Sequence, residues 1–198
     1  MRSFESNLAF VQACLAEILD YERAGQLFWT LSARPPAGSP AFLQMTLGNL
    51  ALALDEIQSV EATLSPKNRA VLLSLQTEWE THRAESSAQL KHKAMQEANS
   101  RIAQWRTYVA EAVVSGDLTE YAVNVRPRLC ALRLMEWLGA DHPGVREAYL
   151  ELAAIEVDLA PRMEEGPFVL DPQLAAVYPP TAHYRFLYVR PLLSTDPS

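Results

Sequence analysis

Hydrophobic residues recur at steps of three and four along the first 165 positions, the spacing that places them on one face of an α-helix. Proline and glycine divide this pattern into about five segments. The pattern therefore predicts an all-α fold with about five helices in a mostly antiparallel bundle. The predicted helices cover residues 3–31, 40–63, 65–115, 117–139 and 141–161.

The segment 65–115 predicts one very long central helix. After the proline at its start, neither glycine nor proline occurs before Gly116, and a helix of this length extends about 75 Å. Large apolar residues are missing between Trp79 and Leu90, so a break near residues 86–87 is the alternative. We expect a continuous helix whose apolar residues have a coiled-coil-like spacing. Good helix formers follow Ser86 and Ser87, and no turn signal accompanies these two serines.

The composition changes at Gly166, where prolines become frequent and forbid a long helix. The aromatic and aliphatic residues between these prolines are too numerous for a solvated tail. The sequence therefore predicts a helical bundle domain over residues 1–165. An extended arm over residues 166–198 is expected to pack on the bundle or on a partner.

Three surfaces are expected to be difficult for a monomer to bury, and the first is the lightly covered middle of the long helix. The start of the second predicted helix is apolar on opposite faces, and the arm is rich in tyrosine and phenylalanine. Exposed apolar patches commonly mark partner sites, and aromatic residues suit interface anchoring. The predicted contact residues are Phe42, Leu43, Met45, Leu47, Tyr178, Tyr184, Phe186 and Tyr188. The leading interpretation is a non-catalytic interaction or scaffold protein that binds a protein partner and self-associates, for example as a homodimer.

Charge suggests an alternative that involves nucleic acid. The chain has a formal charge of -7, but residues 65–115 hold seven Lys and Arg against five Asp and Glu. The predicted phosphate contacts are Arg83, Lys91, Lys93 and Arg101. In this hypothesis, a small helical subunit of a nucleoprotein complex presents residues 83–106 to a phosphate backbone.

Signals for catalysis are weak. The seven glycines never cluster into a phosphate-binding loop. Glu78, His82 and Glu85 share a helix face and could ligate a metal, and acidic pairs occur at helical spacing. These pairs are Glu17 with Asp20 and Glu147 with Glu151. They support a third hypothesis, a carboxylate-based metal-dependent hydrolase, but a solvated helix face explains them as well. We expect no cofactor and no enzymatic activity.

The cysteines and the hydropathy profile bear on location. Cys14 and Cys130 lie in apolar helical patterns, which predicts buried, reduced thiols. The amino-terminal residues lack the pattern of a secretory signal. The longest apolar stretch, residues 41–54, is shorter than the roughly 20 residues that cross a bilayer. We therefore expect a cytoplasmic protein without a membrane span.

Overall fold

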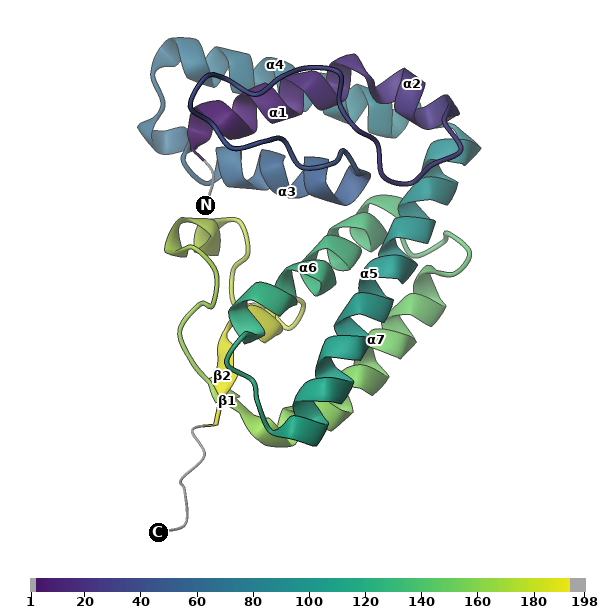
Figure 1. The fold of residues 1–198 in the computed structure, drawn as a ribbon, viewed down its shortest axis with the longest axis vertical. Helices are drawn as coiled ribbons and strands as arrows, with labels where there is room; N and C mark the ends of the chain where they lie inside the picture. Colours follow the sequence, from purple (N-terminus) through teal and green to yellow (C-terminus); the bar gives the residue numbers. More distant parts are fainter. Residues whose placement is uncertain (1–2, 193–198) are drawn as a thin grey trace.

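The structure is a computed structural model that describes residues 3–192 (Figure 1). Within that range the chain forms seven α-helices and one small antiparallel sheet of two strands. The helices are α1 (Phe4–Ala16), α2 (Ile18–Arg23), α3 (Leu47–Gln58), α4 (Pro66–Ala84), α5 (Ala88–Ser115), α6 (Tyr121–Leu138) and α7 (Val145–Leu159). Strand β1 (Met163–Glu165) pairs with β2 (Val189–Pro191), Glu164 lying opposite Arg190. The all-α class predicted from the sequence is confirmed.

The helices gather in two lobes rather than in the single antiparallel bundle that the sequence predicted (Figure 1). In the N-terminal lobe, residues 3–84, helix α1 packs on α3 and α4. In the C-terminal lobe, residues 88–192, helix α5 packs on α6 and α7. Helix α3 contacts α5 and α6 across the lobe boundary. This boundary brings together segments that are far apart in the sequence.

The predicted continuous helix over residues 65–115 is wrong, because the chain bends between α4 and α5. Helix α4 ends at Ala84, and α5 begins at Ala88. Ser87 has an extended backbone (φ −66°, ψ 163°), and its hydroxyl accepts a hydrogen bond from the Leu90 N–H as an N-cap. The break lies where the large apolar side chains are missing. It lets both lobes pack against each other, which a straight rod would prevent.

The first two predicted helices are also shorter than expected. The first ends as α2 at Arg23, and the chain then runs without helix to Thr46. Trp29 and Met45 pair as an antiparallel bridge with N–O distances of 2.8 and 3.0 Å. The Trp29 indole donates to Glu17 at 2.7 Å. These tertiary contacts override helix propensity, and α3 begins after its N-cap Thr46 and not at the predicted residue 40.

The later helices agree with the sequence. Helix α6 continues through Pro127, and α7 lies within the predicted fifth segment. Gly116 ends α5 in the left-handed conformation, with φ 74°, which a residue with a side chain rarely adopts. The C-terminal lobe is therefore the part whose helices the sequence predicts best.

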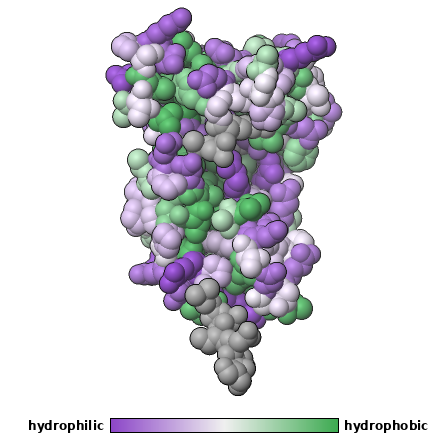
Figure 2. Space-filling view, turned by 60° about the vertical axis from the view of Figure 1, so that its left-hand side comes forward, coloured by the Kyte–Doolittle hydropathy of each residue, from purple (hydrophilic) through white to green (hydrophobic). Residues whose placement is uncertain are grey.

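The proline-rich arm packs on its own chain. Leu174, Tyr178, Phe186 and Leu187 are buried among the helices and belong to the same hydrophobic core. Seen from the side of the arm, hydrophobic residues gather over the C-terminal lobe (Figure 2). The predicted arm continues to residue 198, but residues 193–198 lie outside the described part. Among the helices of residues 3–192, none combines the length and the apolar character needed to cross a membrane.

Candidate functional site at the lobe boundary

A buried carboxylate, Glu97 of α5, joins the two lobes. Its side chain has no exposed surface. It accepts hydrogen bonds from the Thr46 hydroxyl at 2.6 Å, from the Gly48 N–H at 2.9 Å and from Arg101 at 3.2 Å. Thr46 and Gly48 belong to the start of α3, where the backbone N–H groups of a helix favour a negative charge. Glu97 therefore fixes the start of α3 on the C-terminal lobe.

Close packing surrounds this carboxylate. The Cys130 thiol of α6 donates to Glu97 at 3.7 Å. A Cβ added at Gly48 would overlap the Cys130 sulfur and lie 2.8 Å from Glu97 Oε1. Burial, reinforced by Glu97, raises the pKa of the Cys130 thiol. Since the thiolate is the reactive form, Cys130 is a packing residue in this setting and not an activated nucleophile.

Lys93, one turn before Glu97, is buried at 4% exposure. Its ammonium donates to the backbone oxygens of Tyr21 and Gln26 at 2.8 and 2.7 Å and lies 4.2 Å from the centre of the Tyr21 ring. Burial lowers the pKa of Lys93, and Glu22 opposes that change. This lysine therefore ties both α2 and the segment after it to α5.

A second ionic cluster links α3 to α6 and the arm. Asp55 receives two hydrogen bonds from Arg133, at 2.8 and 3.1 Å, and one from the Tyr178 hydroxyl at 2.6 Å. Arg133 also pairs with Glu136, which accepts from the Tyr184 hydroxyl at 2.7 Å. Burial raises the pKa of Tyr178, and the charge of Asp55 adds to this effect. The cluster orders both the arm and α3 around one guanidinium group.

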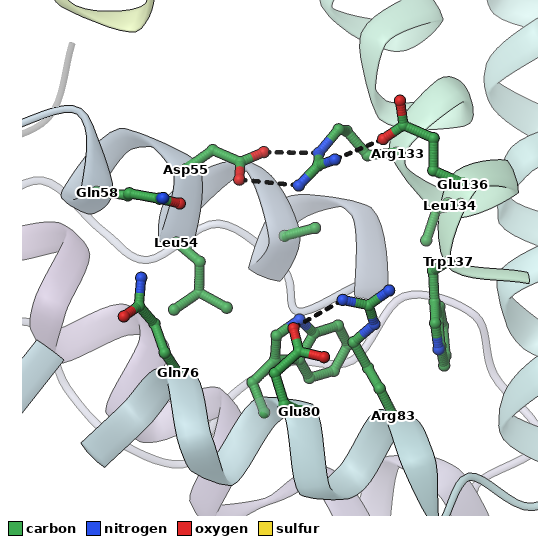
Figure 3. Close-up of a pocket in the computed structure, with 12 residues that line it drawn as sticks. Leu54, Asp55, Gln58, Gln76, Glu80, Arg83, Arg133, Leu134, Glu136 and Trp137 are labelled. Atoms are coloured by element: carbon green, nitrogen blue, oxygen red, sulfur yellow. Dashed lines mark hydrogen bonds and ion pairs between the residues drawn. The ribbon is translucent and has the colours of Figure 1, made fainter. Parts of the chain in front are cut away.

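A small cavity of about 110 Å³ opens beside this cluster (Figure 3). Helices α3, α4 and α6 line it, and Arg83, Gln58 and Gln76 point toward it. Trp79 and Trp137 form one wall, with ring centres 5.6 Å apart. Arg83 donates to Glu80 at 2.7 Å, but its Nε is buried without a partner. A cavity of this size holds a few waters or a small polar group, and its charges are largely paired with each other.

The structure does not bring the four predicted phosphate contacts together. Lys93 is buried, Arg101 pairs with Glu97, and Arg83 pairs with Glu80. Only Lys91 among the four is exposed. A phosphate backbone would therefore meet one lysine here and not a basic surface. Contact with nucleic acid by residues 83–106 stays a prediction.

The predicted protein-binding residues lie in two places. Met45, Leu47, Tyr178 and Phe186 are buried inside their own chain. Phe42 is half-buried against Phe10, and Leu43 keeps 45% of its surface exposed. Tyr184 and Tyr188 are half-buried, and their hydroxyls bond Glu136 and the Tyr178 backbone oxygen. Their role in partner binding stays a prediction, and Leu43 offers the largest exposed area for it.

The metal candidates do not converge. Glu78, His82 and Glu85 do not form a metal-binding group, and no cluster of three His, Cys, Asp or Glu suited to a metal occurs within residues 3–192. Glu17 instead accepts from the Trp29 indole and the Ser32 N–H, and Glu151 pairs with Arg106. Within the described residues, Glu17 and Glu151 therefore have structural partners.

Sequence reasoning missed Glu97, Asp55 and Arg133 as the residues that join the lobes. A signal was present, because Asp55 interrupts the leucine-rich run of α3, and Glu97 lies beside the alanines of the α5 stripe. A charged residue on an apolar helix face requires a buried partner, but the sequence alone does not name that partner.

No known family model matches the chain, and no curated protein or solved structure is significantly similar to it.

Proposed function

We propose that this protein is a non-catalytic helical interaction protein that binds a partner helix along the outer face of α5 and α7. The observation that carries the proposal is that α7 is apolar on two opposite faces. Val145, Leu152 and Ile155 are buried against the C-terminal lobe. Leu150 and Val157, on the opposite face, are 63% and 70% exposed. Apolar residues at this spacing on a solvent face are typical of a helix that packs against another helix.

Small residues extend the exposed apolar stripe. Ala153, Ala154 and Ala160 of α7 and the neighbouring turn are exposed beside Leu150 and Val157. On the adjacent helix α5, Ala103 and Ala110 are exposed, and Val114 is 90% exposed. Small side chains allow a second helix to approach closely, while the larger residues supply contact area. We call this surface the outer face of α5 and α7.

Charge on the outer face favours a basic partner. Four carboxylates lie on or beside it against two guanidinium groups; these are Glu111, Glu147, Glu151 and Asp158, with Arg106 and Arg146. Arg106 and Glu151 already pair with each other. The surplus negative charge, within a chain of formal charge -7, repels a second copy and attracts Lys or Arg. We infer that the partner is an amphipathic helix whose apolar stripe is flanked by basic residues.

A model peptide tests this proposal. The probe is a helical peptide with a leucine and alanine stripe flanked by lysines, compared with the same peptide flanked by glutamates. We expect the basic peptide to shift the amide NMR signals of residues 103–114 and 147–160, and the acidic peptide to bind at least tenfold more weakly. The double substitution Leu150→Asp and Val157→Asp should abolish binding of the basic peptide.

Leu73→Asp is the matched control, because Leu73 on α4 is as exposed as Leu150, at 63%. This variant should bind like the unchanged protein. Equal binding by the Leu150→Asp, Val157→Asp variant, or signal shifts confined to other helices, would reject the outer face as the binding surface. A circular dichroism melt shows that each variant is folded before its binding is compared.

A further inference from the structure

The chain bends between α4 and α5, although the residue types at this position do not require a bend. Residues 85–87 are glutamate and two serines, all compatible with a helix, and neither glycine nor proline lies between Pro66 and Gly116. Glu85 lies in the bridge region beside the helical one (φ −90°, ψ 5°), whereas Ser87 is extended. Both regions are allowed for serine. Rotation about a few backbone bonds would therefore join α4 and α5 into one helix.

The bent junction also leaves polar groups without partners. The Ser86 hydroxyl and the Arg83 Nε are buried, and neither has a hydrogen bond within the described residues. A buried polar group without a partner destabilises the conformation that holds it. In a continuous helix, a serine hydroxyl can bond to the backbone oxygen four residues earlier. The bent junction thus sets one N-cap hydrogen bond against two unpaired polar groups, and contacts elsewhere in the molecule add to what holds the bend.

Those contacts cross the lobe boundary and are specific. Glu97 binds the start of α3, Lys93 binds two backbone oxygens of the N-terminal lobe, and Asp55 pairs with Arg133. Arg126 of α6 pairs with Glu56 of α3 at 2.8 Å. If the helix straightens, these buried groups lose their partners within the chain. A second copy carries the same two surfaces and can restore every one of these contacts.

We propose that residues 85–87 are a hinge through which two copies of this chain exchange lobes. In the exchanged dimer, residues 66–115 form one helix, and the N-terminal lobe of each copy packs on the C-terminal lobe of the other. The partner is a second copy of this chain, and the interface is the one seen here at the lobe boundary. This inference goes beyond the proposed function, because it does not use the outer face of α5 and α7.

Two single substitutions at the hinge act in opposite directions. Ser87→Ala removes the N-cap hydrogen bond that only the bent form makes. It should favour the straight form about fivefold per chain and so raise the association constant of the two-chain dimer about 25-fold. Ala88→Pro suits the bent form, because proline is favoured at the first helical position and follows an extended residue well. It forbids the straight helix, since its ring clashes with the preceding turn and it lacks an N–H. Ala88→Pro should therefore abolish the dimer.

The experiment measures mass by light scattering on the separated oligomers of each variant, after refolding at high protein concentration. We expect a dimer for the unchanged chain, more of it for Ser87→Ala and only monomer for Ala88→Pro. A spin-label pair at the exposed positions 77 and 104 reports the shape. In a dimer of labelled and unlabelled chains, a straight helix holds the labels about 40 Å apart.

Several results would overturn the exchange of lobes. A dimer that persists unchanged in Ala88→Pro is not exchanged through this hinge. Monomers alone for the unchanged chain and for Ser87→Ala, at every concentration, would also reject it. So would a Ser87→Ala dimer without the long label distance. A dimer lost in the Leu150→Asp, Val157→Asp variant but kept in Ala88→Pro would assign self-association to the outer face instead.

Discussion

The two ends of helix α5 are held by different physical means. Its C-terminal half packs Ile102, Trp105 and Val109 into the apolar interior of the C-terminal lobe. Its N-terminal half directs Lys93 and Glu97 into a boundary of buried ion pairs and hydrogen bonds. Apolar packing tolerates changes of similar volume, whereas a buried charge needs its particular partner. We infer that the interior supplies stability and that the boundary decides how the lobes are oriented.

Removal of the Glu97 carboxylate should have the largest effect on the free energy of unfolding. Glu97→Ala leaves Arg101, Thr46 and the Gly48 N–H without their common acceptor. We expect a loss of about 3–5 kcal/mol in the free energy of unfolding, measured by urea denaturation. Glu111→Ala, at an exposed position of the same helix, should change it by less than about 0.5 kcal/mol. Similar losses in both variants would show that the buried network contributes nothing special.

Gly48→Ala tests how closely the boundary is packed. The new methyl group would overlap the Cys130 sulfur and press on Glu97, so we expect a loss of about 1–3 kcal/mol. Gly25→Ala is the matched control, since a Cβ there has no neighbour within 4 Å. Chemical denaturation of both variants checks this. A Gly48→Ala protein as stable as the control would mean that α3 can move away from α6.

Alkaline pH tests the cluster around Asp55. Burial raises the pKa of Tyr178 well above its ordinary value of 10.0, so above pH 10 the unfolded chain loses this proton first. Stability from this tyrosine is fully present below pH 10 and falls above it, by at most about 1.4 kcal/mol per pH unit. Tyr178→Phe should therefore show a shallower loss of stability between pH 10 and 11. Equal slopes in both proteins would contradict a buried, neutral Tyr178.

The smallest effect is expected in the apolar interior. Ile102→Val removes one methylene from a fully buried side chain of α5 and should lower the free energy of unfolding by about 1 kcal/mol. The same denaturation experiment measures it. A loss as large as that of Glu97→Ala would contradict this expectation. It would show that the apolar interior tolerates substitution less well than the lobe boundary does.

Much of the fold, but little of the candidate site, could be predicted from the sequence. Periodicity located α6 and α7, and the predicted helix over residues 117–139 agrees with α6, which continues through Pro127. The segment after Arg23 was predicted as helix, yet it pairs Trp29 with Met45. That pairing depends on contacts sixteen residues apart, which local propensity does not include.

The sequence by itself determined the helices α6 and α7 and that the arm is too apolar for a solvated tail, because these follow from local spacing and composition. Only the tertiary structure decided that the long segment bends at residues 85–87. The residue types there permit both forms, and the choice depends on buried partners such as Glu97 and Gly48 that meet across the lobes. Their pairing is a property of the packed chain, since each charge is tolerated only where its partner lies.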